Sequence, residues 1–187
     1  MIPRWSFAGA VMAGAMASAA SCASVPSDAT IGIDAPPDSV TEFGPVGDYL
    51  DHRCGTLDCH GSSTRNLQIW GCEGMRLAST DIPECSRALG GKATTAEEYE
   101  ATYRSLVGLE PTVMSEVVSG HGQDPDLLTF VRKARGLEAH KGGVLITPGD
   151  PQDVCITSWL AGQTNVSACT PNAISYPQFP VLDASTE

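Results

Sequence analysis

The stretch CGTLDCHG, residues 54–61, carries the most informative chemistry in this sequence. Four residues separate Cys54 from Cys59, and His60 follows the second cysteine directly. Two thiols beside one imidazole suit covalent attachment of haem, a metal site, or a small disulfide loop next to an unused histidine. The usual haem-attachment spacing has two residues between the cysteines, so this motif is a stretched form of it.

The first 21 residues predict a secretory signal peptide. Arg4 precedes FAGAVMAGAMASAA, an apolar run of small residues that is too short to cross a bilayer. Cys22 stands at the expected cleavage point and resembles the acylated cysteine of bacterial lipoproteins, although Ala19 occupies a position that usually holds Leu. An ordinary exported protein cut nearby is the alternative. Because Ala23 rather than an aspartate follows Cys22, we expect a lipid anchor on the periplasmic face of the outer membrane.

The charge balance argues against one class of partner. The chain has 11 basic and 22 acidic residues and a formal net charge of −11, and removing the signal peptide removes a basic residue but no acidic one. A negative field of this size repels nucleic acids and anionic lipids. We therefore expect no nucleic-acid partner.

Six cysteines remain after the signal peptide: Cys54, Cys59, Cys72, Cys85, Cys155 and Cys169. With only 4 Phe, 4 Tyr and 3 Trp the core is modest, and a small exported domain usually needs disulfides. Fifteen pairings are possible, but the spacing suggests Cys72 with Cys85 and Cys155 with Cys169. Each bond would close a loop of about 14 residues, worth roughly 3 kcal/mol. Cys54 and Cys59 are then left for each other or for haem.

The rest of the chain divides by composition. Residues 22–40 are rich in Pro, Ser, Asp and Ala and predict a flexible tether. Residues 173–187 carry two prolines and no helical period, so we expect a loose tail. One domain, residues 41–172, lies between them.

Helix signals recur through this domain. Apolar residues lie on one face of a helix that leads into Cys54: Phe43, Val46, Tyr49 and Leu50. Thr95–Glu98 forms a capping box, and Gly108 is a plausible end for the helix that it starts. Segments 124–136 and 149–162 each begin with Asp-Pro or Gly-Asp-Pro and contain Gly at the end, which predicts two more helices.

The segment RNLQIWGCEGMRLA, residues 65–78, is interrupted by glycines and predicts a loop or a short pair of strands. The predicted fold class is therefore mainly α, with long loops held by disulfides.

The order of these segments resembles that of c-type cytochrome domains in exported bacterial proteins. YLDHRCGTLDCHG looks like the start of such a domain, and YRSLVG, DPDLLTFVRKARGLEAHKGG and DVCITSWLAG follow in the family's order, over residues 43–162. The resemblance implies a small cytochrome c-like helical domain. It also implies that Cys54 and Cys59 carry haem c and that His60 is the proximal ligand of its iron.

The sequence departs from this family at the second axial ligand. The family commonly has a methionine after H-x-G-G, but HKGGVLITPG contains none. His140 is then the best candidate and Met114 the second, and an open sixth position is a further alternative. The remaining candidates have weaker contexts: His121 and His52, which we expect to be solvated, and Met75.

Three functions fit the sequence. The first is a membrane-tethered haem protein that transfers electrons to a periplasmic redox partner. The second is a haem-free lipoprotein with three disulfides that serves as a binding or structural module. The third is a zinc-type site made by Cys54, Cys59, His60 and another histidine. We predict no enzyme, because the sequence shows no hydrolase motif.

Overall fold

The computed structural model describes residues 32–81, 85 and 92–170. The predicted signal peptide, Cys22, the first part of the predicted tether and the predicted tail lie outside the described residues. The chain divides into the units Met1–Gly32 and Ile33–Glu187, and every element below belongs to the second unit.

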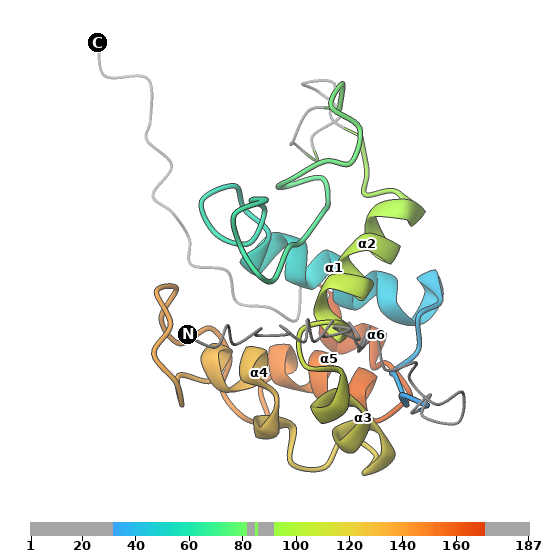
Figure 1. The fold of residues 1–187 in the computed structure, drawn as a ribbon, viewed down its shortest axis with the longest axis vertical. Helices are drawn as coiled ribbons and strands as arrows, with labels where there is room; N and C mark the ends of the chain where they lie inside the picture. Colours follow the sequence, from blue (N-terminus) through green and yellow to red (C-terminus); the bar gives the residue numbers. More distant parts are fainter. Residues whose placement is uncertain (1–31, 82–84, 86–91, 171–187) are drawn as a thin grey trace, which may run out of the picture. The chain divides into compact units, whose positions relative to one another are not determined.

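The described residues are mainly helical, which confirms the fold class at this level. The elements, in order, are α1 (Val40–Cys54), α2 (Ala96–Val107), α3 (Pro111–Ser119), the 3₁₀ turn η2 (Pro125–Leu127), α4 (Thr129–Ala134), α5 (Pro151–Leu160) and α6 (Val166–Cys169) (Figure 1). The described part of the chain contains no strand, only isolated bridges between Thr56 and Gly74 and between Trp70 and Met75. Segment 65–78 is therefore a loop. None of these helices has both the length and the apolar character needed to span a membrane.

Helix α1 places the end of the motif against the core. Ser39 caps it, because its Oγ accepts a hydrogen bond from the backbone N–H of Glu42 at 3.3 Å. The predicted apolar stripe is correct, and all four of its members are buried: Phe43, Val46, Tyr49 and Leu50. Gly47 permits close contact with α2, since a Cβ there would lie 2.8 Å from the Tyr99 ring. Contacts with α2, α5 and α6 thus fix α1 and its last residue, Cys54.

Helix α2 begins with the predicted capping box. Thr95 Oγ1 accepts from the N–H of Glu98 at 3.3 Å, and the Thr95 N–H donates to Glu98 Oε2 at 2.9 Å. The other oxygen, Glu98 Oε1, accepts from Arg76 Nε at 2.8 Å and from the N–H of Leu77 at 3.2 Å. One buried carboxylate therefore both caps α2 and holds the preceding loop.

The helix predicted over residues 124–136 is shorter than expected. Asp124 adopts a left-handed conformation with φ 49° and makes no side-chain cap, and the chain forms only η2 before Leu128 turns extended. Helix α4 starts at Thr129 because Glu110, in the turn before α3, supplies its cap. The Glu110 carboxylate accepts from Thr129 N at 2.6 Å and from Thr129 Oγ1 at 2.8 Å.

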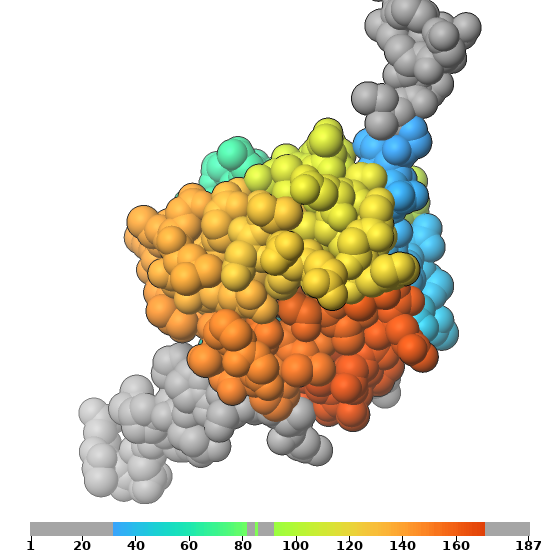
Figure 2. All heavy atoms as spheres, turned by 90° about the horizontal axis from the view of Figure 1, so that it is seen from below, coloured from blue at the N-terminus to red at the C-terminus, as the bar shows by residue number. Residues whose placement is uncertain are grey.

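The predicted tether ends earlier than expected, because residues 33–39, here called the strap, lie along the domain. The Tyr103 hydroxyl donates to the Pro36 carbonyl at 2.7 Å, and Trp159 Nε1 donates to the Pro37 carbonyl at 2.9 Å. Buried Tyr and Trp need partners for their polar groups, and the proline carbonyls provide them. Figures 1 and 2 place the strap (blue) and the loop after α4 (orange) on opposite sides of this unit.

Both disulfides suggested by the spacing are present. Cys155–Cys169 joins α5 to α6, and Cys72–Cys85 joins two points of the long connection between α1 and α2. Near the first bond, Trp159 packs against Phe43 with ring centres 5.3 Å apart. The C-terminal helices are thereby bound to α1.

Candidate cofactor pocket

A cavity of about 490 Å³ lies at the end of α1. Its walls come from α1, the loop after it, the turn before α3, α4, the loop after α4, and α5. The lining residues are Tyr49, Leu50, Cys54, His60, Thr64, Arg65, Asn66, Leu67, Leu109, Glu110, Thr129, Phe130, Lys133, Ala134, His140, Leu145 and Ile156. A mainly apolar cavity of this size with a few polar groups is typical of sites for small ligands and cofactors.

The stretched cysteine motif folds into a compact turn. The N–H of His60 donates to the carbonyl of Cys54 at 2.8 Å, and the N–H of Cys59 donates to the carbonyl of Thr56 at 2.8 Å. These bonds bring the second cysteine and its histidine back to the end of α1. The extra residues are accommodated in the turn, where Leu57 is 56% exposed.

Glycines make this turn possible. A Cβ at Gly61 would lie 1.9 Å from the carbonyl oxygen of Gly55, and a Cβ at Gly74 would lie 1.8 Å from the same oxygen. Neither position therefore accepts another residue without a shift of the backbone.

The two motif cysteines are free thiols in this structure. Cys54 is half-buried and lines the cavity, whereas Cys59 is exposed and is not among the lining residues. Burial raises the pKa of the Cys54 thiol to about 12. The thiol form therefore predominates at neutral pH.

His60 is oriented by a backbone carbonyl. Its Nδ1 lies 3.0 Å from the carbonyl oxygen of Leu67. A carbonyl only accepts, so Nδ1 carries the proton and Nε2 holds the lone pair. Burial lowers the pKa of the imidazole, which favours this neutral form. Metal-binding histidines are held in this way by a hydrogen bond at the other ring nitrogen.

His140 meets His60 across the cavity. The two rings are stacked, with their centres 6.1 Å apart and their planes inclined by 21°. His140 Nδ1 lies 3.3 Å from the carbonyl oxygen of Gly143. Among the described residues neither Nε2 has a hydrogen-bond partner, so both histidines offer the same nitrogen to a ligand.

The other candidates for a second ligand lie elsewhere. Met114 is fully buried in the core beside Val117, as expected for an apolar residue of α3. His121 is exposed and lies in a left-handed turn, and His52 pairs with Glu73. Met75, in the loop, does not line the cavity. Of the candidates named from the sequence, only His140 shares the cavity with His60.

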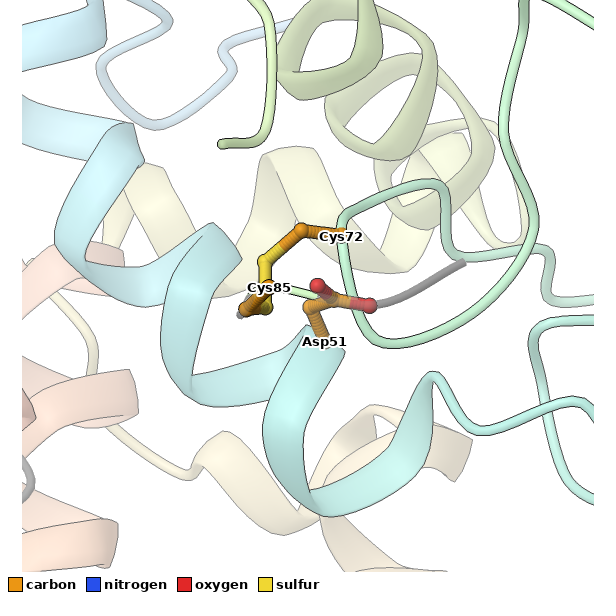
Figure 3. A group of neighbouring side chains, drawn as sticks. All are labelled: Asp51, Cys72 and Cys85. Carbon is orange, nitrogen blue, oxygen red and sulfur yellow. A yellow bond between two sulfur atoms is a disulfide. The ribbon is translucent and has the colours of Figure 1, made fainter. Parts of the chain in front are cut away.

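A second group of possible metal ligands lies outside the cavity. Asp51, Cys72 and Cys85 place a carboxylate oxygen and two sulfurs within 4.8 Å of one another (Figure 3). The two sulfurs are bonded to each other, so they are not thiolate ligands in this state. Sequence reasoning missed Asp51. The available signal was its position next to Leu50 at the buried end of an amphipathic helix.

No family model, curated protein or solved structure matches this chain. The candidate site therefore stands on its own geometry and on the motif that it contains.

Proposed function

We propose that this chain is an exported, membrane-tethered c-type haem protein that transfers electrons. Cys54 and Cys59 would hold the haem through thioether bonds, and His60 and His140 would bind its iron. When bound, the haem supplies an iron that gains and loses one electron.

The separation of the two histidines carries the proposal. A nitrogen that binds a metal at about 2 Å lies about 1 Å from its own ring centre, so two imidazoles on opposite sides of one ion have ring centres about 6 Å apart. The rings of His60 and His140 are 6.1 Å apart. In both rings Nδ1 faces a backbone carbonyl, which leaves Nε2 without a hydrogen-bond partner among the described residues, and both rings line one mainly apolar cavity.

The two thiols add independent support. Cys54 ends α1 at the wall of the cavity, and the turn through Cys59 leads directly into His60. Both thiols are free, while the other two cysteine pairs form disulfides. Thioether formation needs such reduced thiols beside the proximal histidine.

Two axial histidines favour electron transfer over catalysis at the iron. If His60 and His140 both bound the iron, side chains would leave no site on it for a substrate. The chain would then exchange electrons with a periplasmic redox partner. An exposed turn at Leu57 and Cys59 is where such a partner could approach the cysteines.

Expression in a host that exports proteins and attaches haem tests the proposal. We expect a Soret band that survives denaturation and acid–acetone extraction, and a mass increase of one haem. Cys54→Ala should weaken attachment, whereas Cys155→Ala, which breaks a disulfide, should leave the covalent bond intact. A colourless product from such a host would contradict the haem proposal and favour the disulfide-stabilised binding module.

A further inference from the structure

A buried acid lies against the Cys72–Cys85 disulfide. Asp51, in the last turn of α1, is 2% exposed, and its carboxylate lies within 4.8 Å of both sulfur atoms (Figure 3). Glycines make room for it: a Cβ at Gly71 would lie 2.3 Å from the Asp51 carboxylate, and a Cβ at Gly55 would lie 2.7 Å from it. The loop is therefore built closely around this one side chain.

Asp51 has few partners for a buried carboxylate. Its Oδ2 accepts from the N–H of Glu73 at 3.0 Å, while Oδ1 is buried without a hydrogen-bond partner among the described residues. No cation of the described residues forms an ion pair with it. The charged groups that act on it are carboxylates: Glu73 from the loop, Asp48 from α1 and Glu98 from α2. An isolated buried charge is costly, so burial raises the pKa of Asp51 and shifts this group toward its protonated form.

The two disulfides differ in access. Cys85 is exposed and Cys72 is half-buried. In the other bond, Cys155 and Cys169 are 0% and 4% exposed. A thiolate from solution can reach a sulfur of the first bond but not of the second.

We propose that Cys72–Cys85 is an exchangeable disulfide and that Asp51 is its proton donor and acceptor. The co-reactant is a dithiol, as carried by a protein dithiol oxidoreductase. This activity does not depend on haem.

The exchange is balanced in two steps. A thiolate of the dithiol attacks Cys85 Sγ, the Cys72–Cys85 bond breaks, and Cys72 leaves as a thiolate that takes the proton of the Asp51 carboxyl group. This leaves a mixed disulfide between Cys85 and the first sulfur of the dithiol. The second thiolate of the dithiol then attacks that first sulfur and releases Cys85 as a thiolate, which takes a proton from water. The dithiol is oxidised by two electrons, and Cys72 and Cys85 are reduced by two. In the reverse direction the Asp51 carboxylate accepts the proton of Cys72.

The pH dependence of reduction tests this role. Burial, the largest cause, and the nearby carboxylates raise the pKa of Asp51 to about 6. The protonated fraction of such a group rises about tenfold from pH 7 to pH 5. The measurement uses the oxidised full chain and added dithiothreitol. The rate at which Cys72–Cys85 opens is divided by the concentration of dithiothreitol thiolate, which itself changes with pH. This normalised rate should rise about tenfold from pH 7 to pH 5. Alkylation of released thiols and peptide mass spectrometry measure each disulfide separately.

The same chain provides two controls, a neighbouring carboxylate and a second disulfide. Asp51→Asn should abolish the rise, whereas Glu73→Gln, which removes a neighbouring carboxylate, should keep it. The buried Cys155–Cys169 bond should open much more slowly in every sample. Equal opening of both bonds in the wild-type chain, or a tenfold rise retained by a folded Asp51→Asn variant, would overturn the proposal. Circular dichroism checks the helices of both variants.

Discussion

The ring of His140 is oriented by the backbone of its own turn. Its Nδ1 faces the Gly143 carbonyl, and a Cβ at Gly142 would lie 2.9 Å from the ring carbon Cε1. The H-x-G-G sequence thus sets the position of the ring with little help from other side chains.

If the chain holds haem as proposed, His140→Ala should remove one of the two iron ligands without releasing the haem, because Cys54 and Cys59 would hold it covalently. The wild-type ferric protein should give the low-spin absorption and paramagnetic resonance spectra of two imidazoles, and the variant a high-spin spectrum with new binding of azide. His121→Ala is the matched control and should change neither. If the spectrum of His140→Ala matched the wild type while Met114→Leu altered it, Met114 would be the ligand.

At the scale of single residues, the sequence predicts which side chains group together only when they lie within a few positions of one another in the chain. The thiols and His60 are adjacent in the chain, so their grouping is readable from spacing alone. The Leu67 carbonyl that orients His60 comes from a loop with no regular pattern. The walls supplied by Leu109 and Phe130 come from elements far along the chain, so only folding brings them to the site.

At the scale of elements, one ion pair joins the loop before α2 to the helix itself. The Arg76 and Glu98 side chains are 3% and 1% exposed, and Arg76 also donates to the carbonyls of Lys92 and Ala93. Buried pairs are costly to break, because the remaining charge keeps no partner. This contact is one of several that attach the long loop to α2, together with the hydrogen bonds between Trp70 and Thr102.

Arg76→Met should lower the free energy of unfolding by about 3–5 kcal/mol, because it leaves the buried Glu98 carboxylate without its cation. Arg104→Met provides the comparison, since it removes the exposed pair with Glu100 on the same helix and should cost less than about 1 kcal/mol. Urea unfolding followed by circular dichroism measures both. Similar losses in the two variants would mean that Glu98 is stabilised by its backbone contacts alone.

Helices whose signals are local are well predicted, and those capped from a distance are not. The α2 capping box lies within four residues and forms as expected. The start of α4 depends on Glu110, nineteen residues before Thr129, so the local Asp-Pro signal at Asp124 was misleading. The same limit hid Asp51, whose role depends on sulfurs brought by a later loop.

At the scale of the whole molecule, the strap defines where the folded domain begins. Hydrogen bonds from the core reach Pro36, and Asp34 also binds α3 through Ser115. The segment available as a tether after Cys22 is therefore shorter than composition suggests. The lipid anchor remains a prediction from the sequence.

Cys22→Ser should move the protein from the membrane fraction to the soluble fraction, or leave it uncleaved, because the acylated thiol is the proposed attachment. Ser21→Ala, one position away, should leave the protein in the membrane fraction. Fractionation of cells and immunoblotting measure the distribution. Retention of the cleaved Cys22→Ser variant in the membrane fraction would assign the attachment to a protein partner instead.

The contact between the strap and α5 also has a consequence for the order of folding. Pro37 and Trp159 are 122 positions apart, as are Glu42 and Thr164, which are joined by two further hydrogen bonds. Contacts over such separations form late and slow the folding of a chain. Because synthesis proceeds from the N-terminus, α1 lacks its last packing partner, α6, until residue 169 has been made. If haem is attached as proposed, the CGTLDCHG segment would be open to the attaching enzymes before these contacts form, and the finished fold would then close around it.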